Sequence, residues 1–310
     1  LFGLSTPMVQ GLGKGFGSFT TAALLYAGAA VVAWVLRQSA AQEAGIKKSD
    51  WPRLFAMAGT GAVIGPVALA WGLQHTSGSS ASLMLTLEAV FTAVLAWRWY
   101  GETLDKRVVA AVALMLAGGV VLVIEQGTLG QVQLWGLLAV MLATVAWGVD
   151  NTLSRGVADR DPGQVVLVKA VLGSVCTLAL ATLFDEPIPL VTTAMGLVAV
   201  GATGYGLSLR FYLLAQRTFG AARTGSVFAF APFIGAIGAL ALGDRSGSGL
   251  MVMAGALMML GVLLHLMEAH AHEHTHDPLE HEHSHRHDDG HHDHVHALMP
   301  TDPHNHRHKH

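Results

Sequence analysis

Four side chains able to hydrogen-bond or carry charge lie inside long apolar stretches of this chain. Glu88 lies in the middle of one stretch, Asp150 and Asn151 near the end of a second, and Lys169 about a third of the way into another. A charge at the centre of a bilayer costs at least about 2.5–3.5 kcal/mol on insertion scales, so each such charge needs a compensating role. The chemistry that these residues suggest is solute binding and proton exchange within a membrane.

Each of these residues allows a functional and a structural interpretation. Glu88 is a candidate to exchange protons or contact a solute, or it forms a structural hydrogen bond to the backbone of a neighbouring helix. Asp150 and Lys169 are expected to form an ion pair, which lowers the cost of both charges. That pair is either structural, or part of a site in which Lys169 binds an anionic group and Asp150 acts as its gate. Trp147, one turn before Asn151, either walls such a site or packs in the core.

A second group of chemically active residues is the histidines of the C-terminal segment 268–310, which holds sixteen of the eighteen histidines. They alternate with other residues and are interleaved with Asp and Glu, unlike a purification tag. Neutral imidazole is a common metal ligand, so we expect the segment to bind Zn²⁺, Ni²⁺ or Cu²⁺ and to be disordered without them. The candidate ligands are His270, His272, His274, His276, His281, His283, His285, His287, His291, His292, His294, His296, His304, His306, His308 and His310.

The rest of the chain predicts an all-α integral membrane protein. The 310 residues are 52% hydrophobic and 13% charged, against about 25% charged in soluble proteins. After a short first helix that we interpret as truncated, apolar stretches of membrane-spanning length recur, which predicts ten transmembrane helices. Cys176 is expected to be a small core residue. The expected spans are 18–36, 53–73, 79–99, 106–125, 132–153, 163–184, 190–212, 221–242 and 248–267.

Lys and Arg are distributed unevenly between the two sides of these spans. Twelve fall at one set of helix ends and two, Lys14 and Arg245, at the other. Because cytoplasmic loops are enriched in Lys and Arg, the bias predicts both termini, and hence the histidine segment, in the cytoplasm of a bacterium whose inner membrane holds the helices.

The chain also aligns with itself. A shift of 142 residues aligns 74–122 with 216–264 with nine identities, and at a slightly different offset Phe2-Gly3 resembles Trp147-Gly148. A repeat of five helices forces its two copies into opposite orientations, as in many secondary transporters. The predicted domains are therefore repeats at 1–125 and 132–267, followed by the segment 268–310. A duplicated membrane protein without a transport role is the alternative.

Several motifs resemble the EamA type of the drug/metabolite transporter superfamily. The resemblance covers residues 1–267 and rests on short matches in both halves, including Ala146-Trp147-Gly-Val-Asp150-Asn151. Asp244 departs from the Gly-Glu that the family usually has there. The resemblance implies ten helices in two repeats and transport of small organic solutes, without specifying one. Its other motif residues are Pro7, Gly101, Glu102, Arg223, Pro232 and Phe233.

These observations predict a multi-pass secondary transporter that moves organic metabolites or drugs by alternating access, with a proton gradient as the hypothesised driving force. Its expected partners are the bilayer, a small solute, protons and metals on the tail, with no nucleic acid and no required cofactor. The spans contain no nucleophile–base constellation, so an enzyme is not expected. Efflux of Zn, Ni, Co or Cu is the alternative function, and a membrane-anchored metal buffer is another. The sequence makes no prediction about the oligomeric state.

Overall fold

The computed structural model of the protein describes residues 1–36, 45–101, 104–158, 160–219, 224, 227–267, 281–285 and 304–308. The motif residues Glu102 and Arg223 lie outside these described residues. So do ten of the predicted metal ligands: His270, His272, His274, His276, His287, His291, His292, His294, His296 and His310.

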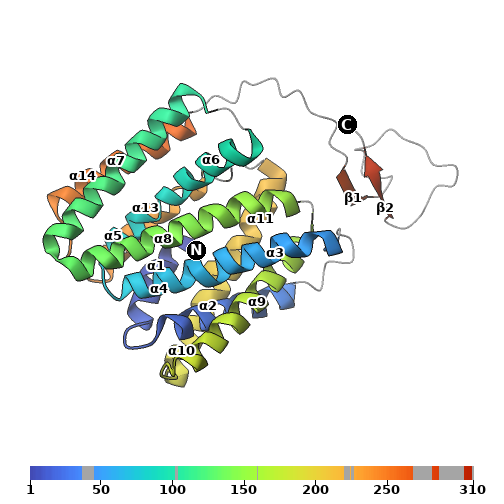
Figure 1. Cartoon of the computed structure of the whole chain (residues 1–310), viewed down its shortest axis with the longest axis horizontal. Helices are drawn as coiled ribbons and strands as arrows, with labels where there is room; N and C mark the ends of the chain where they lie inside the picture. The colour runs from blue at the N-terminus through green and yellow to red at the C-terminus, as the bar shows by residue number, and fades with distance from the viewer. Residues whose placement is uncertain are drawn as a thin grey trace.

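The described part of residues 1–267 is built of helices, which run side by side in Figure 1. Eight of its helical segments are long and apolar enough to cross a membrane, which confirms a multi-pass, all-helical body. The elements are α1 Phe2–Leu12, α2 Ser18–Leu36, η2 Lys48–Asp50, α3 Trp51–Met57, η3 Ala58–Ile64, α4 Gly65–Leu73, α5 Gly78–Met84, α6 Leu87–Tyr100, α7 Lys106–Leu129, α8 Gln131–Ser154, η4 Arg155–Val157, α9 Pro162–Leu183, α10 Val191–Val200, η5 Gly201–Leu207, α11 Ser208–Phe219, α13 Ala231–Ala241 and α14 Gly249–Leu266.

Polar residues define where several helices begin. The side chain of Asp105 accepts hydrogen bonds from the first backbone N–H groups of α7, at 2.7 and 2.8 Å. Asp161 does the same for α9, where Pro162 follows it, and Ser248 does so for α14. These side chains satisfy N–H groups that have no partner within the helix.

Three of the spans are interrupted. Leu85 and Thr86 break the span Gly78–Tyr100 into α5 and α6, so the sequence-predicted helix 79–99 is discontinuous. The spans Lys48–Leu73 and Val191–Ala215 each contain a π-helical segment of seven residues, η3 and η5. Irregular backbone within a membrane is tolerated where it is buried in protein or lines a cavity.

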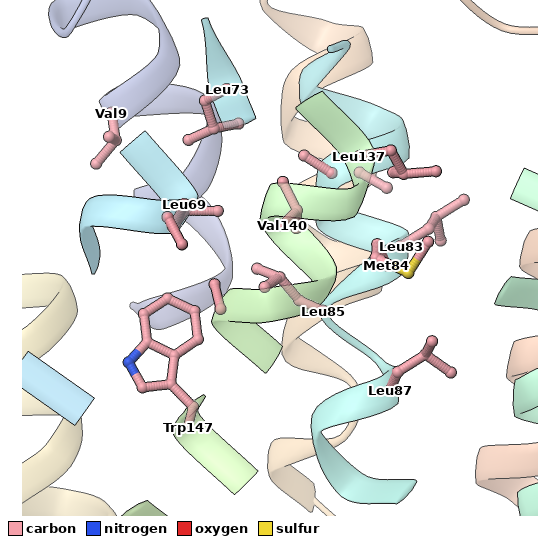
Figure 2. Close-up of a cluster of buried hydrophobic side chains, with 14 of the residues drawn as sticks. Val9, Leu69, Leu73, Leu83, Met84, Leu85, Leu87, Leu137, Val140 and Trp147 are labelled. Carbon is pink, nitrogen blue, oxygen red and sulfur yellow. The ribbon is translucent and has the colours of Figure 1, made fainter. Parts of the chain in front are cut away.

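The apolar core gathers around α8. Figure 2 shows Leu137, Val140 and Trp147 of this helix among Leu69 and Leu73 of α4, Leu83 and Met84 of α5, and Val9 of α1. Helix α8 therefore packs against several helices at once, and its C-terminal part carries Trp147, Asp150 and Asn151.

Helices α7 and α14 lie together at one edge of the bundle (Figure 1) and cross at two glycines. A Cβ atom on Gly118 would lie 2.6 Å from Cγ of Met258 and 2.8 Å from the Ala254 carbonyl oxygen. A Cβ atom on Gly261 would lie 2.7 Å from Cγ of Met115 and 2.8 Å from the Ala111 carbonyl oxygen. The close approach of the two backbones thus depends on the missing side chains.

Gly118→Leu is therefore expected to reduce the free energy of unfolding by about 1–3 kcal/mol, because the new side chain overpacks a backbone contact. Gly127→Leu is the matched control, since a Cβ on this glycine of the same helix meets no atom within 4 Å. The two variants are compared by thermal unfolding in detergent. Equal melting temperatures would contradict the proposed crossing.

Two features differ from the sequence-based expectation. Cys176, expected in the core, is exposed on α9, so that prediction was wrong. Within the segment expected to be disordered, the structure describes two strands, β1 His281–His285 and β2 His304–His308, which pair antiparallel. For the other residues of 268–310, disorder stays a prediction.

Candidate functional site

A cavity of about 60 Å³ lies where α1, α2, α6, α8, α9, η5 and α11 meet. A water molecule needs roughly 10–15 Å³ in this measure, so the cavity holds a few waters or a small group of atoms. All five residues that the sequence singled out for transport line it: Glu88, Trp147, Asp150, Asn151 and Lys169.

The ion pair expected between α8 and α9 is present. The ammonium group of Lys169 donates a hydrogen bond to Oδ2 of Asp150, and both residues are only 3% exposed. The other carboxylate oxygen, Oδ1 of Asp150, is buried and has no hydrogen-bond partner among the described residues. The pair is therefore electrically balanced but leaves one acceptor at the cavity unsatisfied.

Glu88 lies in the first turn of α6, directly after the break at Leu85 and Thr86. The amide of Asn151 donates a 2.7 Å hydrogen bond to its Oε1 atom. The partial positive charge at a helix N-terminus lowers the cost of a carboxylate inside the membrane. The discontinuity thus gives Glu88 a local environment that a continuous helix would lack.

Aromatic rings form much of the remaining wall. The ring of Phe2 lies 5.8 Å from those of Trp147 and Tyr205, both edge-on, and 5.2 Å from that of Phe228. Tyr26 contacts Tyr205, with ring centroids 5.6 Å apart. Trp147 donates a 2.9 Å hydrogen bond from Nε1 to the Gly61 carbonyl, and the Tyr26 hydroxyl donates to the same oxygen. The carbonyl that receives both bonds belongs to the π-helical segment η3.

A further polar cluster, away from this cavity, joins the ends of α1, α4, α5, α7 and α14. The amide of Gln10 donates to the Thr76 carbonyl at 3.0 Å, and the Thr76 hydroxyl donates to Oε1 of Gln126 at 2.9 Å. The hydroxyl of Ser248 donates to Oε1 of buried Glu125. These bonds hold helix ends together on the side away from Asn151.

Asp244, the residue that departs from the family pattern, connects its own loop to the first turn of α5 at this end. Its carboxylate accepts hydrogen bonds from the Ser79 backbone and hydroxyl at 2.9 and 2.8 Å, and from the Ser246 hydroxyl at 2.6 Å. Burial favours a higher pKa for this carboxyl, but the hydrogen bonds from Ser246 and Ser79 outweigh it and lower the pKa.

Asp244→Ala is expected to lower the melting temperature at pH 7 by about 2–4 °C, the shift that a loss of about 1 kcal/mol produces. Because the folded-state pKa is depressed, the carboxylate stabilises the fold above its ordinary pKa, and this contribution is lost as the pH falls through the lowered value. The difference between wild type and variant should therefore shrink in acid. Arg245→Ala, at the exposed neighbour, is the control. A difference independent of pH would contradict this role.

Comparison with known proteins identifies the family of the chain. The sequence profile of the EamA-like transporter family matches residues 1–124 and 134–267. The chain belongs to the EamA-like transporter family. The resemblance in its motifs is thereby confirmed, and the members of this family are transporters.

Two relatives of this EamA-like chain are described as uncharacterized transporters. One, from Methanothermobacter thermautotrophicus, is 28% identical over 230 residues, covering 72% of this chain and 66% of the relative. The other, YyaM of Bacillus subtilis, is 25% identical over 201 residues, covering 62% of this chain and 65% of the relative. The chain thus spans just under two thirds of the length of these relatives.

A solved crystal structure shares the fold of this EamA-like chain. It aligns with a TM-score of 0.60 and 20% identity, covering 85% of this chain and 94% of the other. At this identity the likeness concerns the fold alone.

The four other motif residues that lie within the described part of the EamA-like chain do not line the cavity. Pro7 is buried in α1, Pro232 and Phe233 are buried in the first turn of α13, and Gly101 ends α6 in the left-handed conformation with φ 68°. These four residues shape helices and helix ends rather than the cavity wall.

Sequence reasoning missed the cavity aromatics Tyr26, Tyr205, Tyr212 and Phe228. Phe2 was noticed only as part of the repeat. Glycines near 61 and 204 mark the interrupted segments beside these rings, and that was the one signal available in the sequence.

Proposed function

We propose that the chain is a secondary transporter of a small organic solute, driven by a proton gradient and working by alternating access in the inner membrane of a bacterium. The observation that carries the proposal is the convergence of Glu88, Asp150 and Lys169 on one cavity from three different spans. Ionisable side chains inside membrane spans are costly, and in transporters they mark solute and proton pathways.

Two symmetric features support two inverted repeats of five helices each, ten in all. The π-helical segments run from 58 to 64 and from 201 to 207, so the second follows the first by 143 residues at both ends. The α7–α14 crossing is reciprocal, since Gly118 meets Met258 while Gly261 meets Met115. Both spacings are 143 residues, one more than the 142-residue shift of the sequence alignment, and inverted repeats commonly enclose the binding site of transporters.

The side of the membrane to which the cavity belongs follows from the charge bias. If the Lys- and Arg-rich loops are cytoplasmic, Asn151 and Lys169 lie in the inner half of the membrane and the cluster of Gln10, Thr76 and Gln126 in the outer half. The hydrogen-bonded outer cluster then closes the outer path. Transport requires this cluster to open while the inner path closes.

The test is a transport assay with the full chain in proteoliposomes that contain a pH-sensitive dye. Candidate solutes come from comparing the metabolites of cells with and without the gene. We expect at least one solute to drive proton movement only when the protein is present. Well-inserted protein that moves neither protons nor any solute of the panel would overturn the proposal.

The histidine segment is proposed to bind Zn²⁺, Ni²⁺ or Cu²⁺ and to act apart from the transport cavity. The strand register supports a local cluster, since it pairs histidine positions with histidine positions: 281 with 308, 283 with 306 and 285 with 304. The described cavity lining, in contrast, contains carboxylates but neither His nor Cys, the ligands that transition metals favour.

Deleting residues 268–310 is therefore expected to abolish tight metal binding, because it removes sixteen histidines, while leaving transport of the organic solute intact. Metal content by mass spectrometry and solute uptake are measured on the same preparations. Loss of all transport in well-inserted, metal-free truncated protein would contradict the division of the chain into these two parts.

A further inference from the structure

We propose that the transported solute is an organic cation, with an N–H-bearing ammonium or amidinium group attached to an apolar or aromatic body. This inference rests on the proposed transport function and names the chemical class whose cationic group the cavity of about 60 Å³ can take. Three features of the cavity lead to it: its hydrogen-bond donors, its acceptors and its rings.

Each of the four main donor groups of the cavity wall already donates one hydrogen bond within the protein. Trp147 and Tyr26 both donate to the Gly61 carbonyl. Asn151 donates to Glu88, and Lys169 donates to Asp150. In particular, the positive charge of Lys169 is neutralised by the carboxylate beside it. An anionic solute would therefore have to break a buried ion pair to obtain a countercharge.

Acceptors, in contrast, are left over. Oδ1 of Asp150 is buried without a partner among the described residues. Asn151 occupies only one oxygen of Glu88, and no other described residue donates to this carboxylate. Because a buried acceptor without a donor is costly, a solute that brings N–H groups into the cavity recovers that cost.

The formal charge of the described cavity lining also favours a cationic solute. Lys169 balances Asp150, and Glu88 adds one further negative charge that only a neutral amide contacts. An ionised Glu88 thus makes the cavity attractive to a cation and repellent to an anion. This differs from the sequence-based hypothesis that Lys169 binds an anionic group.

The rings specify the rest of the solute. Six aromatic side chains line the same cavity as the carboxylates: Phe2, Tyr26, Trp147, Tyr205, Tyr212 and Phe228. The face of an aromatic ring attracts a cation held within about 6 Å, and the same rings pack against an apolar body. Tyr205, whose hydroxyl has no hydrogen-bond partner among the described residues, can donate to or accept from a solute and therefore does not select for either charge.

The test uses matched triplets in which one apolar body (phenylethyl, indolylethyl or hexyl) carries an ammonium, a carboxamide or a carboxylate group. Binding to the purified full chain is measured by thermal stabilisation in detergent, and transport by counterflow in proteoliposomes. We expect ammonium members to bind at least about tenfold more tightly than their carboxamide and carboxylate partners, the ratio that one charge-assisted hydrogen bond provides.

Variants assign the effect to the cavity. Glu88→Gln is expected to weaken ammonium binding about tenfold or more and to leave carboxamide binding unchanged, because only the charge is removed. Phe2→Leu removes one aromatic ring but leaves the carboxylate side chains of Glu88 and Asp150 in place. It should therefore also weaken ammonium binding. The control is Glu186→Gln, a carboxylate outside the cavity that accepts hydrogen bonds from the backbone of Phe19 and Thr20.

The outcomes separate the two proposals. If carboxylate or carboxamide members bind and exchange as well as the ammonium members, or if no ammonium member binds, the cation inference is overturned while transport stands. If no solute of any charge moves across membranes that hold folded protein, the transport function itself falls.

Discussion

We expect Lys169→Met to lower the free energy of unfolding by about 3–5 kcal/mol, because it leaves the Asp150 carboxylate buried without a countercharge. Both side chains of the pair are almost completely buried, so bulk solvent stabilises the remaining charge only weakly. Asp150→Asn should be nearly as costly, since it leaves the ammonium group of Lys169 in the same position. Each variant can be measured by SDS titration of the protein in bicelles.

The decisive variant is the double substitution Asp150→Asn with Lys169→Met. Removing both charges together eliminates the uncompensated charge, so most of the lost stability should return, whereas transport should not if the pair belongs to the site. Lys14→Met, at an exposed lysine, is the control and should change little. Additive losses in the double variant would mean that the two charges do not stabilise one another.

The parts of this fold that the sequence predicted are those that depend on hydropathy and charge. The length of an apolar stretch is fixed by the membrane, so the expected span 18–36 agrees with α2, and 163–184 lies within one residue of α9 at each end. The Asp150–Lys169 pair was predictable for a related reason, because two opposite charges at similar depth are cheaper together.

What the sequence did not predict depends on which side chains meet across helices. Tyr26 and Tyr205 are far apart in the chain, but their rings are in contact in the cavity. This contact was not predictable because hydropathy does not show which face of a uniformly apolar helix points inward. The break before Glu88 was also missed, since Leu85 and Thr86 fit a continuous helix equally well. Such breaks are stabilised by neighbouring helices, which a local pattern does not describe.

Glu88→Gln is expected to abolish proton-driven transport while solute exchange at saturating concentration continues. Glutamine keeps the shape of the side chain and can still accept the hydrogen bond from Asn151, so the cavity should stay intact. It cannot bind and release a proton, however, so the link between proton movement and solute movement is lost. The measurement compares uptake under an imposed pH gradient with counterflow in the absence of one.

The position of Glu88 makes this result specific. Among the described cavity residues, the Glu88 carboxylate contacts no opposite charge and accepts only the hydrogen bond from Asn151. Asp150, in contrast, forms an ion pair with Lys169. A proton on Glu88 removes the charge that a cationic solute needs, so proton and solute should compete for this carboxylate. Wild-type counterflow should accordingly weaken as the pH falls and that of Glu88→Gln should not. Full proton-driven uptake by Glu88→Gln would refute the coupling role, and Asp150 would then be the carboxylate to test.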